Sequence, residues 1–454
     1  VDVQPPALGS GSTFTLLCGK TPRRMRLLYN ILFPVFFLLS APYYFWKLVR
    51  RGNWRTGFGQ RFGAYGVLRE KLKGKRVLWL HAVSVGEANL AIQLVKSMQP
   101  HHRDWTFVVS TITTTGMGEL ERKLPADVHR VYYPIDWLPF VRSAFRALNP
   151  ATIILVEAEI WPNLFWHAKS TNVPVHLINA RLSENSFNGY CRYGYLFKPL
   201  FRSLRAAGVH NETDAERLAE LGCDRKAIIV TGNMKFDGTA TTDADTTDPR
   251  AMLREIGVPD EAPVFVAGST FEGEEELLCQ LLPQWRKEHP DLFLVLVPRH
   301  FERASAVLEN LKPMNLRIRC RTAMNVSSDK PDVLLVDTTG ELKAFYEVAT
   351  LVFVGKSLTA QGGQNPIEPA ALGRPMVFGP FMQNFKPVVQ SLLEAEAAIQ
   401  VADETELAVK MSNLLGNPEQ RDALGAAARA VVESNKGATQ RTAELIGQTL
   451  RALG

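Results

Sequence analysis

Short apolar segments alternate with amphipathic ones along two long stretches of this chain. The apolar segments are typical of buried strands and lie at residues 77–80, 106–111, 152–157, 174–179 and 228–231, and then at 264–267, 292–297, 333–336, 351–354 and 375–378. Such alternation is typical of parallel sheets with helices on both faces. The sequence therefore predicts an α/β fold with two doubly wound domains that face a central cleft.

The predicted domain boundaries follow from length and local composition. With 454 residues, the chain is too long for one ordinary core. Residues 239–262 turn polar and are predicted to link a first domain at 52–238 to a second domain at 263–454. Residues 1–24 are polar and rich in turn-forming residues, so we expect a disordered extension there, with the natural start at Met25.

Residues 27–49 are almost wholly apolar and aromatic, and Lys47 is their only charged residue. The segment is about as long as a helix must be to cross the hydrocarbon core of a bilayer. Basic residues flank both of its ends, and the tyrosines and tryptophan just before Lys47 are typical of a membrane interface. A buried core helix is the alternative, but Pro34 and Pro42 would kink it. We therefore predict a membrane anchor at 25–51 that either spans the bilayer or lies in its interface.

Composition and missing motifs exclude several classes of function. The net charge of +6 suits an anionic partner, but no block of lysine and arginine is interleaved with aromatic residues, so we expect no nucleic-acid partner. The five cysteines are scattered without a CxxC pair, which indicates neither a disulfide framework nor a metal site. Without a GxGxxG or P-loop motif, the chain does not resemble a standard dinucleotide oxidoreductase or a P-loop NTPase.

The stretch His81-Ala-Val-Ser-Val-Gly-Glu87 directly follows the predicted strand at 77–80. Helical spacing begins near Asn89, so Glu87 lies where a strand gives way to a helix. Open α/β sheets bind their ligands at this edge. A carboxylate here can anchor the start of the helix or act as a catalytic base, and the sequence leaves both roles open.

Three further stretches in the first half follow predicted strands. Glu157 opens the stretch to Asn163 and is a candidate site carboxylate, although a solvated loop under Trp161 is the alternative. The polar stretch at 179–183 suits a sugar or a lipid headgroup, and it equally suits an ordinary surface helix. Lys235 follows the last strand before the predicted linker, where an ammonium group can meet the charge that develops on a leaving phosphate. A lone lysine at such a place is also common on plain surface.

Two candidate phosphate contacts follow strands of the second half. Ser269 lies between a strand and an acidic helix start, where free backbone N–H groups can bind an anion. The acidic first turn can equally cap its own helix. Pro298 and Arg299 follow another strand, and a guanidinium group can donate two parallel hydrogen bonds to a phosphate.

The strongest cluster of the second half runs from Gln361 to Pro369. Its two glycines permit a close approach of the backbone to a ligand. Asn365 and Pro366 are typical of a helix entry, and Glu368 then falls within the first turn, where its carboxylate could accept hydrogen bonds from ribose hydroxyls. Capping by Glu368 is the alternative, but the combination favours nucleotide binding.

Taken together, these motifs resemble those of 3-deoxy-D-manno-octulosonic acid (Kdo) transferases, which add Kdo to the lipid A precursor. Their order and spacing carry the resemblance, which runs from about Met25 to the end of the chain. It implies a GT-B fold of two Rossmann-like domains that needs neither a metal nor a cofactor. The N-terminal domain would take the lipid acceptor and the C-terminal domain would take CMP-Kdo.

The resemblance also implies roles for single residues. Glu87 would be the general base, and Glu157 and Lys235 match positions assigned to transition-state stabilisation. The positions that match contacts to CMP, with Ser269 added as a candidate anion contact, are Pro298, Arg299, Thr339, Gly340, Glu341, Asn365, Pro366, Ile367 and Glu368. The sequence departs from the family pattern at Lys356, where a glycine is frequent, at Gln364, where a histidine is common, and at Thr339, where a methionine is usual.

The implied function is an inverting transfer of Kdo from CMP-Kdo to the lipid A precursor (lipid IVA) in lipopolysaccharide core biosynthesis. The catalytic domains would lie on the cytoplasmic side of the bacterial inner membrane. Two alternatives stay open at this point. One is another GT-B transferase that uses a UDP- or GDP-sugar with a lipid acceptor. The other is a non-catalytic membrane nucleotide-binding protein, against which the carboxylate at Glu87 argues.

Overall fold

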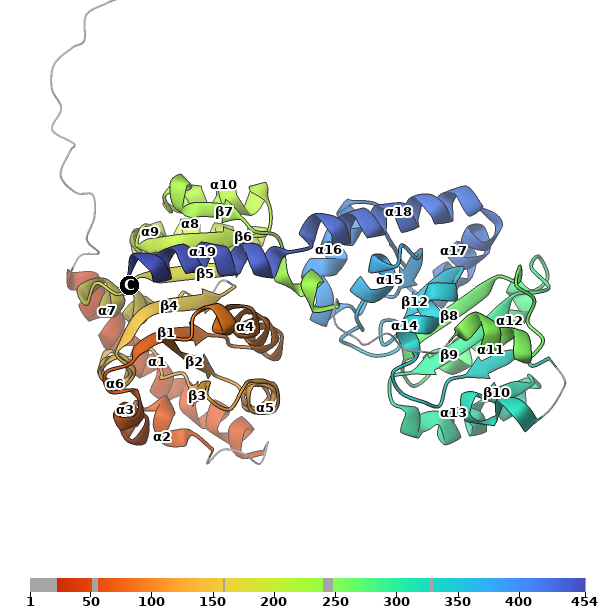
Figure 1. Cartoon of the computed structure of the whole chain (residues 1–454), viewed down its shortest axis with the longest axis horizontal. Helices are drawn as coiled ribbons and strands as arrows, with labels where there is room; N and C mark the ends of the chain where they lie inside the picture. Colours follow the sequence, from red (N-terminus) through yellow and green to blue (C-terminus); the bar gives the residue numbers. More distant parts are fainter. Residues whose placement is uncertain (1–22, 51–55, 158–159, 240–247, 327–329, 454) are drawn as a thin grey trace, which may run out of the picture. The chain divides into compact units, whose positions relative to one another are not determined.

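The computed structural model describes residues 23–50, 56–157, 160–239, 248–326 and 330–453 (Figure 1). They form two compact units. The N-terminal unit takes its residues from Val1–Asn233 and Ala438–Gly454, and the C-terminal unit takes its residues from Met234–Gly437. Up to residue 22, the predicted extension lies outside the described residues, whereas residues 23 and 24 belong to the first helix, α1 (Arg23–Arg50).

This division differs from the predicted domains in the second half of the chain. The last helix, α19 (Ala438–Ala452), belongs to the N-terminal unit, where the Arg441 side chain donates a hydrogen bond of 2.9 Å to the carbonyl of Thr231. The sequence pattern of α19 marks an amphipathic helix but does not say on which core that helix packs. Within the predicted linker, α11 (Pro249–Glu255) belongs to the C-terminal unit, and residues 240–247 lie outside the described residues.

The sheet of the N-terminal unit is wholly parallel, in the order β3-β2-β1-β4-β5-β6-β7. Its strands are β1 (Arg76–His81), β2 (Trp105–Thr111), β3 (His129–Tyr132), β4 (Pro150–Val156), β5 (Val175–Ala180), β6 (Leu204–Val209) and β7 (Ile228–Val230). Five of them confirm predicted strands. The other two, β3 and β6, were not predicted because polar and small residues interrupt their apolar pattern.

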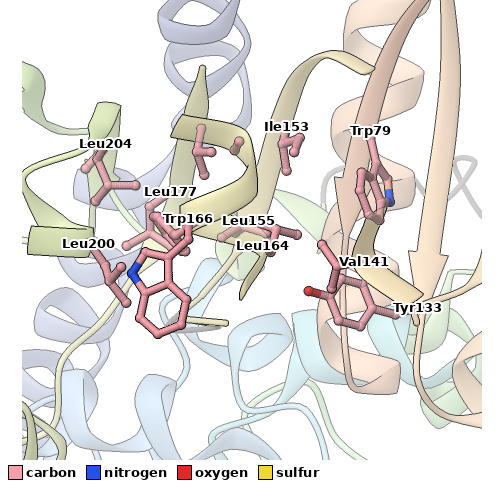
Figure 2. Close-up of a cluster of buried hydrophobic side chains, with 14 of the residues drawn as sticks. Trp79, Tyr133, Val141, Ile153, Leu155, Leu164, Trp166, Leu177, Leu200 and Leu204 are labelled. Atoms are coloured by element: carbon pink, nitrogen blue, oxygen red, sulfur yellow. The ribbon is translucent and has the colours of Figure 1, made fainter. Parts of the chain in front are cut away.

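Helices cover both faces of this sheet and enclose its core (Figure 1). They are α2 (Phe58–Arg61), α3 (Gly66–Leu72), α4 (Val85–Met98), α5 (Thr114–Lys123), α6 (Leu138–Leu148), α7 (Pro162–Ser170), α8 (Glu184–Arg192), α9 (Gly194–Phe201) and α10 (Glu212–Glu220), together with α1 and α19. Figure 2 shows part of the core, in which Trp79 of β1 lies near Tyr133, which follows β3, and near Val141 of α6. Because the strands are buried on both faces, their apolar runs are continuous rather than alternating.

The sheet of the C-terminal unit is also wholly parallel, in the order β10-β11-β9-β8-β12-β13-β14. Its strands are β8 (Val264–Thr270), β9 (Phe293–Pro298), β10 (Ile318–Cys320), β11 (Val333–Leu335), β12 (Leu351–Val354), β13 (Met376–Phe378) and β14 (Ile399–Gln400). The predicted strands of the second half are confirmed. Both edge strands, β10 and β14, are too short and polar to be recognised by pattern.

Helices again flank this second sheet (Figure 1). Besides α11, they are α12 (Glu274–Trp285), α13 (Ala304–Leu311), α14 (Leu342–Val348), α15 (Ile367–Ala371), α16 (Lys386–Glu394), α17 (Glu404–Gly416) and α18 (Pro418–Asn435). In both units, the loops that follow the strands emerge at one edge of the sheet, which we call the carboxyl edge. Most of the predicted site residues belong to these loops.

Helix α1 covers most of the predicted membrane anchor and packs along the N-terminal unit. The hydroxyl group of Tyr29 donates a hydrogen bond of 2.9 Å to Asp136, and Asn30 exchanges hydrogen bonds with Asn163 at the start of α7. Several large apolar side chains of α1 nevertheless stay exposed: Leu27, Leu28, Ile31, Leu32, Val35, Phe36, Leu38 and Leu39. Within the described ranges, no helix is both long enough and apolar enough to cross a membrane.

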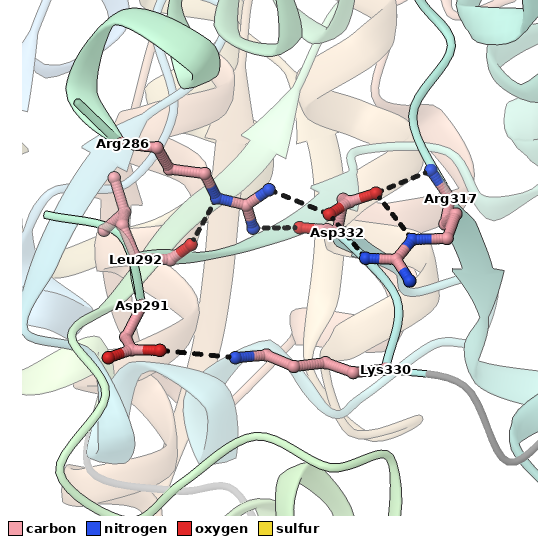
Figure 3. Close-up of polar contacts among 6 residues, drawn as sticks. All are labelled: Arg286, Asp291, Leu292, Arg317, Lys330 and Asp332. Carbon is pink, nitrogen blue, oxygen red and sulfur yellow. Dashed lines mark hydrogen bonds and ion pairs between the residues drawn. The ribbon is translucent and has the colours of Figure 1, made fainter.

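Asp332 joins the amino ends of three strands in the C-terminal unit (Figure 3). Its carboxylate accepts hydrogen bonds of 3.0 Å from Arg286 and of 3.1 and 3.2 Å from the guanidinium group of Arg317. Arg286 also donates to the carbonyl of Leu292. Burial alone would raise the pKa of Asp332, but the hydrogen bonds from the two arginines outweigh it and hold that pKa below its ordinary value of 3.8.

We expect Asp332→Ala to lower the free energy of unfolding of the C-terminal unit by about 2 kcal/mol, because it removes charge-assisted hydrogen bonds from two arginines. The matched control is Asp260→Ala, which breaks a half-exposed pair with Arg254 and should cost under about 0.5 kcal/mol. Since the folded pKa of Asp332 is lowered, its contribution is present above pH 3.8 and disappears as the pH falls below it. Equal losses for the two variants in urea unfolding would contradict this role.

Candidate functional site

Glu87 lies in the first turn of α4, directly after β1 ends at the carboxyl edge. Its backbone N–H donates a hydrogen bond of 3.2 Å to the Ser84 hydroxyl oxygen, and its carboxylate accepts from the Ser84 backbone N–H at 3.3 Å. These reciprocal bonds form a capping box. The carboxylate also accepts hydrogen bonds of 2.8 Å from the N–H of Val83 and 2.7 Å from the hydroxyl group of Ser84.

The anchoring role of Glu87 is thus confirmed, and it is compatible with a role as a base. An ionised carboxylate offers about four acceptor positions. The loop occupies three of them, two on Oε1 and one on Oε2. With the residue only 6% exposed, the remaining position on Oε2 is held in a fixed direction. The bonds that anchor the helix also orient the group that would take a proton.

Glu87 and Glu157 follow the neighbouring strands β1 and β4 at this edge of the N-terminal sheet. Burial raises the pKa of Glu87 above its ordinary value of 4.5, and the negative charge of Glu157 adds to the rise. The hydrogen bonds from Val83 and Ser84 oppose it without cancelling it. A general base works best when its pKa lies near the working pH, so this shift favours proton transfer. Within the N-terminal unit, the predicted residues Glu87 and Glu157 therefore interact electrostatically.

We expect Glu157→Gln to shift the acidic limb of the pH profile of kcat/KM to lower pH. The variant removes the negative charge that disfavours ionised Glu87, so the pKa of Glu87 falls. The residual activity is measured from about pH 4 to pH 8 and fitted for the acidic pKa. Glu184→Gln, an exposed carboxyl group of α8, is the control and should leave the limb in place. An unshifted limb for Glu157→Gln would show that the two carboxylates do not interact.

Lys235 belongs to a different unit from Glu87 and Glu157. It belongs to a short 3₁₀ helix, Met234–Thr239, which is part of the C-terminal unit. The predicted first domain, 52–238, had placed it with Glu87 and Glu157. The second unit begins at Met234, shortly after β7. The change of unit thus comes five residues before residue 239, where the predicted linker begins.

Non-glycine residues with left-handed backbone occur at the carboxyl edges of both sheets, as well as after four helix ends elsewhere. Glu157 and Asn179 have φ values of 59° and 50°, and in the C-terminal unit Ser269 and Lys356 both have a φ of 53°. Left-handed backbone costs a non-glycine residue roughly 1–3 kcal/mol and is frequent at functional sites. No sequence pattern at these four positions had predicted this strain. Its one signal was Lys356, which stands where the related family often has a glycine.

The carboxylates at the start of α12 bind backbone N–H groups of the neighbouring loops and of their own helix start. Glu274 is fully buried, and its carboxylate accepts hydrogen bonds from the backbone N–H groups of Phe271, Lys356, Ser357 and Leu358 at 2.7 to 3.0 Å. At the same helix start, the N–H of Gly273 donates to Glu276. These bonds confirm the capping alternative, since the chain's own carboxylates occupy these backbone donors. Ser269, half-buried beside them, stays a predicted contact.

The predicted nucleotide cluster gathers around Glu368 in α15. Asn365 donates a hydrogen bond of 3.0 Å to the Glu368 carboxylate and accepts one of 3.1 Å from the N–H of Ile367. Burial raises the pKa of Glu368, while the bond from Asn365 and the positive charges of Lys343 and Arg299 oppose the rise. The structure thus places Arg299 near Glu368, although the two lie on separate loops. The helix begins at Ile367, one residue later than predicted, with Pro366 as its N-cap.

A second loop of the C-terminal unit carries the other predicted contacts. Glu341 is buried and accepts hydrogen bonds from Arg321 and Thr338. Thr339 and Gly340 are exposed, and Gly340 has a φ of 92° with no atom near the place where a Cβ would lie. This open backbone leaves room for a ligand. No group of three metal-ligating side chains occurs in the described parts of the chain.

Comparison with known proteins identifies relatives of this chain. A sequence model of the family described as 3-deoxy-D-manno-octulosonic-acid transferase (kdotransferase) matches residues 56–238. The 3-deoxy-D-manno-octulosonic acid transferase of Haemophilus influenzae is 31% identical over 402 residues, which cover 88% of this chain and 92% of that protein. The protein of the same name from Bordetella pertussis is 32% identical over 415 residues, with coverage of 88% and 94%.

Solved structures share the fold of two parallel-sheet α/β domains. The UDP-GlcNAc 2-epimerase of Neisseria meningitidis, bound to UDP-GlcNAc, matches with a TM-score of 0.51 at 15% identity and covers 82% of this chain and 100% of that chain. The S. aureus MnaA–UDP structure matches with a TM-score of 0.50 at 12% identity, with coverage of 83% and 97%. At these identities the likeness shows the fold alone, and it confirms the predicted GT-B class.

Proposed function

Because this chain belongs to the 3-deoxy-D-manno-octulosonic acid (Kdo) transferase family, we propose that it moves Kdo from CMP-Kdo to the lipid A precursor. The observation that carries the proposal is the state of Glu87. This buried carboxylate is oriented by three hydrogen bonds, keeps one acceptor position, and has a pKa that burial and Glu157 raise.

The proposed chemistry follows from these groups. The oxygen of the acceptor hydroxyl attacks the anomeric carbon of Kdo, and Glu87 takes the proton of that hydroxyl. A carbon–oxygen bond forms there, and the bond to the phosphate of CMP breaks, so CMP leaves with the electron pair. One base opposite the leaving group is sufficient for inversion, as in inverting hydrolases, where water replaces the sugar hydroxyl. Lys235 would meet the charge that develops on the departing phosphate.

Donor binding is assigned to the carboxyl edge of the C-terminal unit. Arg299 supplies a guanidinium group suited to phosphate, and Glu368, oriented by Asn365, supplies a carboxylate suited to ribose hydroxyls. The open backbone at Gly340 admits a ligand close to the chain. These features support a nucleotide-linked donor, and the names of the relatives point to Kdo as the sugar that it carries.

The acceptor is a lipid, so we assign α1 to the cytoplasmic surface of the inner membrane. One side of this helix is held to the N-terminal unit by Tyr29 and Asn30, and the exposed side carries large apolar residues such as Phe36 and Leu39. Apolar side chains on a surface helix favour binding in the membrane interface, and the exposed Arg24 would contact anionic headgroups.

The proposed donor is tested by comparing sugar nucleotides. The full chain is incubated with tetraacyl lipid A precursor and, in separate reactions, with CMP-Kdo, a UDP-sugar or a GDP-sugar. We expect a heavier lipid in mass spectra only with CMP-Kdo. A heavier lipid with the UDP- or GDP-sugar, and none with CMP-Kdo, would assign the chain to a different donor.

A further inference from the structure

An apolar pocket of about 310 Å³ lies between α1 and the carboxyl edge of the N-terminal sheet. Three phenylalanines of α1 line one side of it, and residues that follow β2, β3 and β4 line the other. The main apolar lining residues are Phe33, Phe36, Phe37, Ile112, Tyr133 and Trp161. Its volume lies at the lower end of the range of small-molecule sites.

The walls of this pocket favour an apolar occupant. Water in a cavity needs two to four polar partners, and cavities lined by aliphatic and aromatic side chains bind apolar ligands instead. The carboxylate in the wall, Asp136, already accepts hydrogen bonds from the Tyr29 hydroxyl group and from the backbone N–H groups of Asn163 and Leu164. It therefore offers little to a polar ligand.

The pocket is continuous with the exposed apolar side of α1. Phe36 lines the pocket and is also 68% exposed, so the pocket reaches the surface at this residue. Leu32 and Leu39, one turn away in each direction along the helix, are exposed as well. A chain of methylene groups could therefore pass from a membrane interface at α1 into the pocket without crossing polar surface.

Hydrogen bonds tie the inner wall of the pocket to the loop that holds Glu87. Ile112 lies between Thr111 and Thr113, and both threonine hydroxyl groups donate to the carbonyl of Val83 at 3.2 Å. The N–H of Val83 in turn donates to the carboxylate of Glu87. The pocket wall at Ile112 and the loop of the candidate base are therefore joined by hydrogen bonds.

One of the lining residues carries a positive charge. The guanidinium group of Arg61 lines the pocket, donates a hydrogen bond of 2.6 Å to the carbonyl of Ile112, and stacks at 4.2 Å over the ring of Tyr132. Its Nε is buried without a hydrogen-bond partner. An arginine beside an apolar pocket complements a molecule that joins an anionic headgroup to an acyl chain.

We propose that this pocket binds one acyl chain of the lipid acceptor and thereby places the acceptor hydroxyl near Glu87. The inference rests on the proposed function, because it names the part of the acceptor that the N-terminal unit recognises. An aliphatic chain fits the apolar walls and the surface opening at Phe36, and an anionic headgroup fits the charge of Arg61. The pocket would then select acylated acceptors over the free sugar headgroup.

The first test is photolabelling of the full chain in detergent, without donor. The probe is tetraacyl lipid A precursor with a diazirine at the end of one acyl chain, and the labelled residues are located by mass spectrometry. We expect the label on Phe33, Phe37 or Ile112, with competition by unlabelled precursor. Label confined to outward residues such as Leu39 would show only general contact with lipid and would overturn the proposal.

The second test compares two apolar-to-asparagine variants in transfer assays. Phe36→Asn changes a pocket residue, whereas Val67→Asn changes an apolar residue of α3 that is 77% exposed and outside the pocket lining. We expect Phe36→Asn to raise KM for the acylated acceptor about 5-fold to 10-fold and to leave KM for the deacylated headgroup unchanged. Val67→Asn should leave the ratio of the two KM values as in the wild type.

The outcomes separate the pocket from the proposed function. If the wild type transfers Kdo but both variants keep the wild-type ratio of KM values, the pocket does not bind the acyl chain and the proposed function stands. If the wild type transfers Kdo to neither acceptor, the proposed function fails. In that case photolabelling still decides whether the pocket binds an acyl chain.

Discussion

Glu87→Gln is expected to lower kcat for Kdo transfer by about 10²-fold to 10⁴-fold while the N-terminal unit stays folded. Glutamine at this helix position can still complete the capping box, because its carbonyl oxygen accepts the hydrogen bond from the backbone N–H of Ser84. Its amide group cannot take a proton from the acceptor hydroxyl. The variant thus removes the proposed base and keeps most of the anchor.

A comparison with Glu87→Ala separates the two roles of the residue. Alanine removes both the base and the cap, so this variant should be equally inactive and also less stable by about 1 kcal/mol. Circular dichroism melts give the stability, and calorimetry with CMP checks that the C-terminal unit still binds nucleotide. If Glu87→Gln keeps wild-type kcat, Glu87 is only a helix anchor and the base must be sought elsewhere.

Glu274→Ala is expected to destabilise the C-terminal unit by about 4 kcal/mol. The buried carboxylate accepts four backbone hydrogen bonds, three of them from residues 356–358, and a buried donor left without a partner costs about 1–3 kcal/mol. The loop after β12 would lose its attachment to α12. Hydrogen exchange at residues 356–358 is the most local measurement, and we expect much faster exchange in the variant.

The matched control for this prediction is Glu272→Ala. It makes the same change of charge two residues earlier, but the Glu272 side chain is exposed. Its effect on stability should be under about 0.5 kcal/mol, as is usual for surface substitutions. Unchanged exchange at residues 356–358 in Glu274→Ala would mean that other contacts hold the loop in place.

Much of the fold could be predicted from the sequence, because buried parallel strands leave continuous apolar runs such as Val77–Leu80. The same rule fails for short edge strands and for β6, where small residues replace large ones. It also cannot assign α19 to a unit, because an amphipathic pattern shows that a helix is half-buried but not on which core it packs. These features depend on contacts between distant residues.

For the site, the sequence indicated which single residues matter, but it did not indicate which of them contact one another. Glu87 and Glu368 were marked by their places after strands and in first helical turns, and the structure shows both with oriented carboxylates and raised pKa values. Glu274 binds residues 356–358, which lie more than 80 positions further along the chain, so no local sequence pattern marks these bonds. Likewise, the apolar pocket needs α1 and three separate loops at once, so no local pattern marks it.

The most direct measurement is the mass of the lipid product together with the amount of CMP released. Wild-type protein, tetraacyl lipid A precursor and CMP-Kdo are incubated, and both products are quantified. We predict a lipid that is heavier by whole Kdo residues and one CMP released for each Kdo gained. A lipid of unchanged mass, whether CMP-Kdo stays intact or is merely hydrolysed, would contradict the proposed transfer.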